Sequence, residues 1–430
     1  MKLVKKHICA PCFLFIGVIT ASTSFANTPY VPLFDAADLA VSRAGSAAIV
    51  QDASTNYTNP AGIALFTNPK LTISGIGVIT PARFTGTATS PGFGSYYSQT
   101  AGSSTRAAGV VPTFFYSRPL SERWAAGIAV TTPYAFGANY GTDSVVRYEI
   151  IYGKQMSLDI GPNIAYKINS QWSIGGGPDL LYYYAGSKSA MRTQPFTTSD
   201  TYTVSQLTAL RPGYHFGVLF EMTQQSRIGV SYHSQIIMPL NGSSTLYMGD
   251  NSFIAPPVTH VTNYKVKLPL AGVFTLSGYH ALNPRWAILG TIEYMNWGIY
   301  QYDHVQNAVT PVGVIDAVAP RTFQNTFTYA LGGTYKYNDK WLWRAGTNYY
   351  PQNVSGSNKD VTFTNAINIS LSCGAKYQVN RQVSIDMAYD HGFTRTVNLH
   401  HTYAFSGNTI SGRKSSNTNA LGVQMNYDFV

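Results

Sequence analysis

Hydrophobic and polar residues alternate along most of the chain, most clearly near its C-terminal end. One set of alternate positions holds Leu421, Val423, Met425, Tyr427 and Phe429, and the positions between them hold Gly422, Gln424, Asn426 and Asp428. Residues 383–390 repeat the pattern, with Asp386 and Asp390 among the polar positions. Because successive side chains of a β-strand point to opposite faces, this period predicts strands with one apolar and one polar face. Such strands are typical of a membrane β-barrel and of a water-soluble β-sandwich.

Short polar turns separate the predicted strands, and one turn motif recurs six times. An aromatic or apolar strand end is followed by a few polar residues, and the next strand then begins, often with Trp. The six copies are residues 116–124, 166–172, 220–228, 279–286, 335–341 and 377–383. Asn, Asp and Pro between two alternating segments are hairpin signals.

The spacing of these turns predicts the number of strands. Consecutive copies lie about 50 residues apart, so each interval holds two strands of about 10 residues and one long loop. If both chain ends lie on the side of the short turns, six turns imply 14 strands. An even number closes an antiparallel barrel, and closure leaves no unpaired edge in hydrocarbon. Trp124, Trp172, Trp286 and Trp341 recur at the same strand level, as in the aromatic girdle of a membrane barrel. We therefore expect an all-β fold, a 14-stranded antiparallel transmembrane β-barrel.

The segment before the first predicted strand, residues 71–79, does not follow this pattern. Residues 34–50 are rich in Ala and predict short helices around Gly45. A barrel of this size has a lumen that can hold a further segment. We interpret residues 27–68 as a small helical plug, called the hatch below, inside a barrel formed by residues 69–430. A loose periplasmic tail is the alternative.

Residues 1–26 have the pattern of a secretory signal peptide. Lys2, Lys5 and Lys6 precede a short apolar segment, residues 8–19, and Ser24-Phe25-Ala26 supplies a cleavage site. The apolar segment is shorter than the ~20 residues that a spanning helix requires. Removal of residues 1–26 would also remove two of the three cysteines, so the mature chain would form no internal disulfide.

Composition limits the function classes. Charged residues make up 11% of the chain, against about 25% in soluble domains, and aromatic residues make up 13%. The net charge is +10, but the basic residues are scattered and accompany no nucleic-acid motif. We therefore expect no nucleic acid among the partners, and expect outer-membrane lipid and lipopolysaccharide. No metalloprotease, nucleophile-elbow or phosphate-loop motif is present, so we expect neither an enzyme nor a cofactor or metal.

Several charged residues fall at lumen-facing positions of the predicted strands. Glu293, Arg344 and Asp386 are expected to form solvated ion pairs that hold strands in register, and Asp390-His391 is expected to make hydrogen bonds at the rim.

The N-terminal segment resembles the hatch of the FadL-type long-chain fatty acid and hydrocarbon transporters. The resemblance is carried by residues 43–56 followed by Asn59-Pro60-Ala61-Gly62. Residues 111–140, 229–234 and 329–346 match the family in the same order, so the likeness covers nearly the whole mature chain.

This resemblance implies an outer-membrane location, a 14-stranded barrel with a hatch, and a lateral exit at a kink in the third strand. Here residues 124–132 form the predicted third strand and Pro133, which has no N–H for the ladder, follows it. That Pro133 merely ends the strand is the alternative. Asn59, Pro60 and Ala61 of the hatch, with Pro133, Tyr134, Phe136 and Gly137, would then control the exit. By the same alignment Thr132 would help hold a substrate carboxylate, and Lys188 and Arg321 are the nearest basic candidates.

The function implied is passive uptake of a long-chain fatty acid or similar hydrophobic compound, with lateral release through the wall of a monomeric barrel. Two alternatives stay open: a surface adhesin or structural barrel whose loops bind ligands, and a nonspecific porin. An open pore requires neither a hatch nor a kinked wall, and this favours uptake of a hydrophobic compound.

We predict that the mature protein begins at Asn27 and that its band on an electrophoresis gel shifts on boiling, because a closed barrel resists detergent at room temperature. N-terminal sequencing and paired boiled and unboiled samples check this. An intact Met1, or a circular dichroism spectrum dominated by helix, would contradict it.

Overall fold

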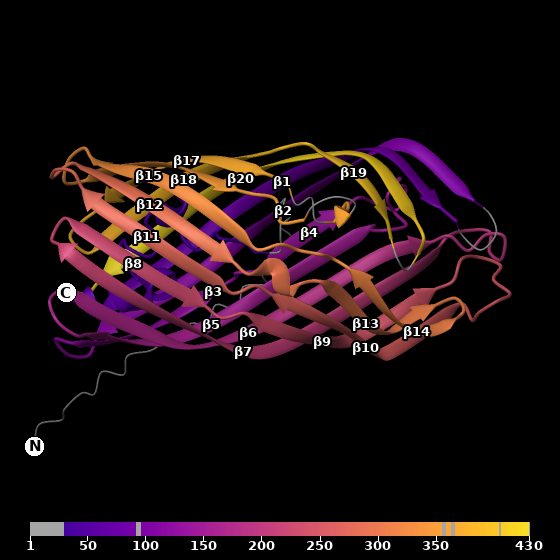
Figure 1. The fold of residues 1–430 in the computed structure, drawn as a ribbon, viewed down its shortest axis with the longest axis horizontal. Coiled ribbons are helices and arrows are strands. Elements are labelled where there is room, and N and C mark those ends of the chain that lie inside the picture. The colour runs from indigo at the N-terminus through magenta and orange to yellow at the C-terminus, as the bar shows by residue number, and fades with distance from the viewer. Residues whose placement is uncertain (1–29, 92–95, 355–357, 363–365, 404–405, 430) are drawn as a thin grey trace, which may run out of the picture.

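The computed structural model describes residues 30–91, 96–354, 358–362, 366–403 and 406–429. The predicted signal peptide, residues 1–26, and the first residues of the hatch lie outside this part of the chain. The described strands form one antiparallel sheet that closes on itself (Figure 1). Closure occurs at β1 (Lys70–Ser90), which pairs with β2 (Tyr97–Pro119) on one side and with β20 (Thr409–Asp428) on the other.

The barrel wall has 14 strand positions in the described part of the chain, as the turns predict. Eight positions hold one continuous strand each: β1, β2, β5 (Tyr152–Lys167), β6 (Trp172–Met191), β7 (Thr201–Thr223), β16 (Trp341–Tyr350), β17 (Asn368–Gln378) and β20. Six positions hold a strand in two pieces: β3/β4 (Trp124–Thr131, Ala135–Asn139), β8/β9 (Ser226–His233, Ile236–Tyr247), β10/β11 (Val258–Leu270, Val273–Ala281), β12/β13 (Trp286–Met295, Tyr302–Thr310), β14/β15 (Gly313–Pro320, Thr326–Lys336) and β18/β19 (Val383–Thr394, Val397–Thr402).

The strands are longer than the sequence pattern predicts. The first strand was expected over residues 71–79, but β1 runs from Lys70 to Ser90. Outside the hydrocarbon a strand needs only hydrogen-bonded neighbours to continue, and β1 keeps both β2 and β20 beside it almost to its end. The apolar alternation therefore marks the part of a strand that faces lipid, and the ladder extends beyond it.

All six predicted turns lie where the motif places them, at the end of the barrel drawn on the left of Figure 1. In three of them an Asn side chain accepts the backbone N–H of the Trp that begins the next strand. The Oδ1–N distances are 2.8 Å for Asn169–Trp172, 3.0 Å for Asn283–Trp286 and 2.9 Å for Asn338–Trp341. These side chains satisfy backbone donors that the tight turn leaves without a ladder partner.

The four Trp side chains at these turns each contact an aromatic ring directly across the ladder. The ring centroids are 4.6 Å apart for Trp124–Tyr166 and 4.3 Å apart for Trp172–Phe220. Trp286–Tyr335 and Trp341–Tyr377 repeat the contact at 4.4 and 4.7 Å. This confirms the predicted aromatic girdle at the short-turn end.

The two faces of the wall differ as the alternation predicts. On β20, Leu421 is 62% exposed on the outer face, and Gln424 is 1% exposed on the inner face. Exposed large apolar side chains recur along β6, β12 and β17 as well, for example Ile174, Ile288 and Leu371. A surface of this kind is stable in lipid rather than in water.

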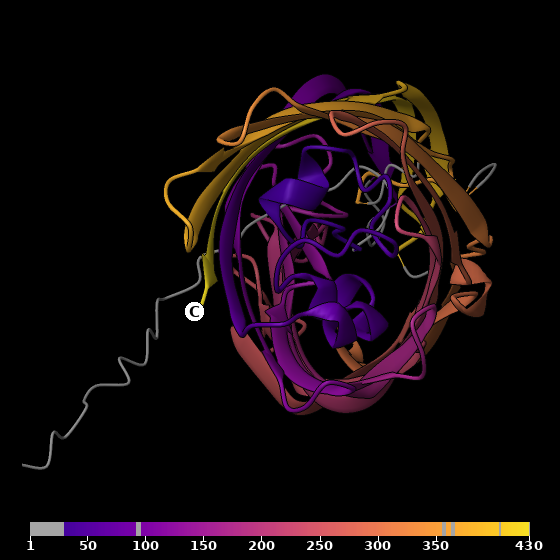
Figure 2. The ribbon, with the colours of Figure 1, turned by 90° about the vertical axis from the view of Figure 1, so that its left-hand side faces the viewer.

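The N-terminal segment lies inside the barrel, where Figure 2 shows it in indigo within the ring of strands. It contains α1 (Ala36–Leu39), α2 (Thr55–Thr58) and the 3₁₀ helix η1 (Pro60–Leu65). A further 3₁₀ helix, η2 (Trp297–Ile299), fills the break between β12 and β13. Of the short helices predicted around Gly45 the structure has one, α1, and residues 40–48 form turns in which the backbones of Ser42, Arg43 and Gly45 are left-handed (φ +50°, +69° and +81°). No helix in the described residues has the length and apolar character needed to span a membrane.

Glycines on the inner face of the wall let the hatch backbone approach the strands closely. A Cβ on Gly217 would lie 2.0 Å from Asn59 Oδ1, and one on Gly229 would lie 1.7 Å from the carbonyl oxygen of Ala47. Further close approaches of the hatch, at 1.8–2.6 Å from the position of an added Cβ, occur at Gly127, Gly175, Gly346 and Gly374. Side chains at these positions would displace the hatch.

We predict that Gly217→Ala loosens the hatch, because the added methyl group overlaps Asn59. Overpacking of this kind costs about 1–3 kcal/mol. Ion conductance of the protein in planar bilayers should rise, and the temperature of the gel-band shift should fall. The matched control is Gly278→Ala, since a Cβ there meets nothing within 4 Å. Equal conductance of the two variants would contradict close docking of the hatch on β7.

Candidate functional site

The hatch is fixed to the wall by buried side-chain amides. The Asn59 Nδ2 group donates to the carbonyl oxygens of Ala47 (2.7 Å) and of Val218 on β7 (3.0 Å). Its Oδ1 accepts the N–H of Ala61 (3.1 Å) and so caps η1. Asn59 therefore holds two parts of the hatch and one barrel strand together, and Pro60 follows as the first residue of η1, where a missing N–H costs nothing.

A second set of contacts joins the hatch to the last strand. Gln424 Oε1 on β20 accepts the backbone N–H groups of Ala36 (2.9 Å) and Ala37 (3.3 Å), and its Nε2 donates to Asp52 (3.1 Å). The nearby Arg344 pairs with Asp386 and also donates to Gln51 of the hatch (3.0 Å).

The third strand is broken where Pro133 was expected to disturb it. β3 ends at Thr131, and β4 resumes at Ala135. β3 pairs with both neighbours, β2 and β5, whereas β4 pairs with β5 and, in the described residues, forms no ladder with β2. The Asn139 N–H at the end of β4 donates to Thr105 Oγ1 on β2 (2.7 Å). The wall therefore lacks one run of backbone pairing beside Thr132–Asn139.

The hatch supplies part of the pairing that β2 does not. The N–H of Val31 donates to the carbonyl oxygen of Pro133 (2.8 Å), and Tyr30 forms an isolated antiparallel bridge with Tyr134. The backbone of Tyr134 also exchanges hydrogen bonds with Ser157 on β5 (2.8 and 2.9 Å). The kink is thus held between the wall and the start of the hatch.

The chain around the kink is covered on both sides. Ala135, Phe136, Gly137 and Ala138 are all buried, whereas a strand of the wall alternates between buried and exposed residues. β4 therefore lies away from the lipid-facing surface, and predicted exit residues Pro133, Tyr134, Phe136 and Gly137 lie within this single segment.

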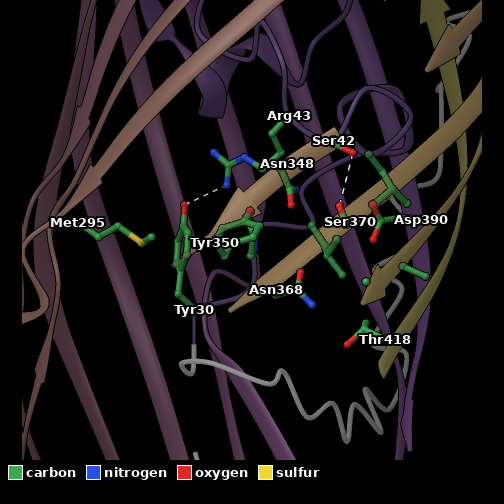
Figure 3. A pocket seen from close by; sticks show the side chains of 15 residues that line it. Tyr30, Ser42, Arg43, Met295, Asn348, Tyr350, Asn368, Ser370, Asp390 and Thr418 are labelled. Atoms are coloured by element: carbon green, nitrogen blue, oxygen red, sulfur yellow. Dashed lines mark hydrogen bonds between the residues drawn. The ribbon is translucent and has the colours of Figure 1, made fainter. Parts of the chain in front are cut away.

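A cavity of about 100 Å³ lies between the hatch and the wall (Figure 3). Tyr30, Pro32, Leu33 and Leu39 give it an apolar side. Its lining also includes polar groups from β16, β17, β18 and β20: Asn348, Asn368, Ser370, Asp390 and Thr418. Tyr30 borders the cavity and also bridges to the kink at Tyr134, so the two features share a residue.

Arg43 places a guanidinium beside this cavity. Its Nη2 lies 2.7 Å from Glu293 of β12, and its Nη1 donates to the Tyr30 hydroxyl (3.3 Å). The guanidinium also lies over the ring of Phe34, 5.2 Å from the centroid. The ion pair is buried, with side-chain exposures of 10% and 3%.

The expected ion pairs do form, but the prediction that water surrounds them was wrong. Arg344 and Asp386 do pair across the wall, but both side chains are nearly fully buried. Glu293 pairs with Arg43 of the hatch instead of another strand. The hatch excludes the water that an open lumen would have supplied. Asp390 and His391 also separate: Asp390 lines the cavity, and His391 Nδ1 lies 2.9 Å from Asn419 Oδ1.

The three predicted substrate-binding residues do not converge. Thr132 is buried at the start of the kink. Lys188 on β6 lies over the ring of Tyr202, 4.7 Å from its centroid. Arg321, between β14 and β15, pairs with Asp303 (2.5 Å) and Asp360 (2.6 Å). No hydrogen bond or ion pair among the described residues joins these three to one another. Arg43 lies within residues 43–56, which carry the family resemblance, and no local pattern in the sequence indicates that it pairs with Glu293.

Comparison with known proteins agrees with this architecture. A family model described as outer membrane protein transport protein (OMPP1/FadL/TodX) matches residues 17–429. The long-chain fatty acid transport protein of Escherichia coli K12 is 24% identical over 85% of this chain and 88% of its own. Outer membrane protein P1 of Haemophilus influenzae is 24% identical over 90% of this chain and 92% of its own.

Solved structures share the fold. A FadL homologue from Pseudomonas aeruginosa superimposes with a TM-score of 0.83 at 20% identity, covering 94% of this chain and all of that one. The toluene transporter TodX of Pseudomonas putida superimposes with a TM-score of 0.71 at 18% identity, covering 92% and 98%.

We predict that Arg43→Met lowers the free energy of unfolding by about 3–5 kcal/mol, because it leaves Glu293 buried without its partner. The double variant Arg43→Met/Glu293→Met should recover part of this loss, since it removes both charges. Denaturant titration of each protein in lipid vesicles measures the difference. A double variant no more stable than the single one would contradict a role for the ion pair in holding the hatch.

Proposed function

Because the chain belongs to the OMPP1/FadL/TodX family of outer-membrane transport proteins, we propose that it carries long-chain fatty acids or similar hydrophobic compounds into the cell by passive capture and lateral release. The family is one of transport proteins rather than enzymes, and the chain is an outer-membrane protein, as expected from its sequence. The relatives named for fatty acids and for toluene set the chemical range of the proposal.

An apolar route through the barrel supports a hydrophobic substrate. One cluster of packed apolar side chains includes Tyr30, Phe34 and Tyr57 of the hatch and Tyr134 of the kink. The same cluster continues through the wall at Leu181, Tyr183, Leu207, Met238, Leu240, Leu268 and Leu270, and reaches Trp297 of η2. A hydrophobic compound can exchange contacts along such a surface without entering water.

The observation that carries the lateral mechanism is the break between β2 and β4. Along β3 ladder hydrogen bonds join the wall on both sides, and a passing molecule would have to break them. Beside β4 the described residues form no ladder with β2; there the Asn139 N–H donates to Thr105, and Tyr30 and Val31 of the hatch bond to the kink. We infer that a small movement of the hatch N-terminus, with Asn59, Pro60 and Ala61 as its fixed base, opens a passage past Pro133 into lipid.

A polar end of the substrate would bind near the cavity or the kink. We propose Thr132, which is buried at the start of the kink, for this role, and Arg43 lies beside the cavity with its charge already paired. Lys188 and Arg321 stay candidates for capture farther along the lumen, where a substrate carboxylate would compete with Asp303 and Asp360 for Arg321. We further propose that the protein acts as a monomer in contact with lipid and lipopolysaccharide, and binds no nucleic acid.

A nonspecific porin is the main alternative. The hatch contacts described above argue against it, because Asn59, Gln424 and Arg43 hold residues across the lumen. A surface adhesin or structural barrel is the other alternative.

We predict that a disulfide joining β4 to β2 blocks release. Thr105→Cys with Asn139→Cys, in a Cys373→Ser background, would form it at a position where the two residues already touch. Uptake of a labelled long-chain fatty acid should fall under oxidising conditions and recover with reductant, at matched surface levels. The single-cysteine variants are the controls.

Full uptake through the oxidised double variant would contradict the lateral route but leave transport intact. Equal uptake by cells with and without the protein, for fatty acids and monoaromatic compounds alike, would contradict the proposed function.

A further inference from the structure

Three potential metal ligands converge on the inner face of the wall, and none of them lines the cavity or belongs to the kink. Asp179 lies on β6, His215 on β7 and His233 on β8, and their ligand atoms all lie within 4.8 Å of one another. Strand register brings them together, since His215 and His233 are direct partners in the β7–β8 ladder. Among the described residues these are the ones that meet the spacing of a metal site.

The distances fit a site that tightens around an ion. His215 Nδ1 lies 2.6 Å from Asp179 Oδ1, and His233 Nδ1 lies 3.9 Å from Asp179 Oδ2. The two imidazole rings are stacked with centroids 5.4 Å apart. Ligand atoms around a tetrahedral ion with bonds near 2.1 Å are about 3.4 Å apart, so small rotations of these side chains would suffice. The His215–Asp179 distance would lengthen as the ion replaces a shared proton, and the His233–Asp179 distance would shorten.

The outer hydrogen bond of His233 directs its lone pair toward Asp179. Its Nε2 lies 3.0 Å from the carbonyl oxygen of Tyr57, an acceptor only, so Nε2 carries the proton. The unprotonated Nδ1 then faces the carboxylate. Metal-binding histidines have this arrangement, in which the remote N–H donates to a carbonyl and fixes the ring.

Two buried polar atoms near the cluster lack partners. His215 Nε2 makes no hydrogen bond, although the side chain is only 2% exposed. Asp159 Oδ1 on β5 is equally unpaired and buried, and Asp159 lies near enough to Asp179 for the two carboxylates to interact. Gly161 leaves space beside the pair, since a Cβ there would lie 2.9 Å from Asp179 Oδ1.

The buried negative charge of two carboxylates near the cluster favours a bound cation. Asp159 and Asp179 bring two carboxylates into the buried wall, and in the described part of the chain no Lys or Arg forms an ion pair with either. Isolated carboxylates are costly to bury unless a cation or a proton compensates them.

We propose that Asp179, His215 and His233 form a binding site for a divalent transition-metal ion such as Zn²⁺, Ni²⁺ or Cu²⁺. Imidazole with one carboxylate is a donor set that suits these ions and disfavours Ca²⁺ or Mg²⁺, which prefer oxygen ligands. Water or Asp159 completes the coordination.

The site is joined directly to the hatch. The ring of His233 stacks on Tyr57 with centroids 4.4 Å apart, in addition to the bond from Nε2 to the Tyr57 carbonyl. Tyr57 lies in α2, two residues before Asn59. An ion that orders His233 therefore stabilises the docked hatch, and binding to the folded state raises the temperature of unfolding.

The test uses the untagged, full-length mature protein in detergent, after treatment with a chelator. Co²⁺ is added alone and its visible d–d absorption is followed, and Zn²⁺ is then used to displace it. We expect one equivalent of Co²⁺ per chain and a Zn²⁺-dependent rise in the temperature of the gel-band shift. These readouts on the unaltered protein depend neither on transport nor on any variant folding.

Three variants and one control locate the site. Asp179→Asn, His215→Gln and His233→Gln should each weaken Co²⁺ binding at least about tenfold and abolish the Zn²⁺ effect on the gel-band shift. His280→Gln should bind Co²⁺ as the unaltered protein does, because His280 is exposed, lies outside the cluster and shares a hydrogen bond with Ser226. No binding by the unaltered protein, or equal binding by the His215→Gln and His280→Gln proteins, would overturn the proposal and leave Asp179–His215 as a structural hydrogen bond.

Discussion

Backbone amides and carbonyls in hydrocarbon must find partners within the protein, because an unpaired group there costs several kcal/mol. In this chain the requirement is met by a ladder that runs from β1 around the wall to β20 and back to β1. Closure has a second consequence, since a ring of this many strands encloses a lumen too wide for side chains alone to fill. The hatch occupies that space, and its backbone contacts the wall at glycines that leave room for it.

The requirement for paired backbone groups also applies at the kink, where β4 forms no ladder with β2. β4 gives up its partner β2 but lies buried on both faces, so its free backbone edge is turned away from lipid. Val31 and Tyr30 then satisfy part of that edge. A break in the wall is therefore compatible with stability only while the hatch lies beside it. Any movement of the hatch changes the energetics of the wall at the same place, which links the cavity at Tyr30 to the segment at Tyr134.

The sequence predicts the parts of this fold that depend on near neighbours. Turns such as Asn169–Trp172 combine a local hydrogen-bond acceptor with an aromatic residue, so they can be recognised from the sequence alone. Their number then gives the number of strands. The broken third strand was also expected, from the family resemblance together with Pro133. Proline alone does not break a strand here, since Pro112 and Pro178 lie within the continuous strands β2 and β6. Contacts across the lumen were not predictable in this way. Arg43 and Glu293 are 250 residues apart, and nothing local indicates that the hatch rather than a strand supplies the partner. The convergence of His215 and His233 depends on register, and the ladder between β7 and β8 contains an irregularity near Glu221 that spacing alone does not reveal.

The hydrogen bonds from Ala36 and Ala37 to Gln424 also have a consequence for biogenesis. These residues are separated by 388 and 387 positions, and the acceptor lies on the final strand. Residues 36 and 37 of the hatch, which are synthesised before every strand, therefore make these two hydrogen bonds only after the last strand has been inserted. Loop closure over so many residues is favourable only when the intervening strands have already paired. Docking of residues 36 and 37 thus requires a complete chain. If assembly stops before β20 is inserted, this part of the hatch has no partner in the wall.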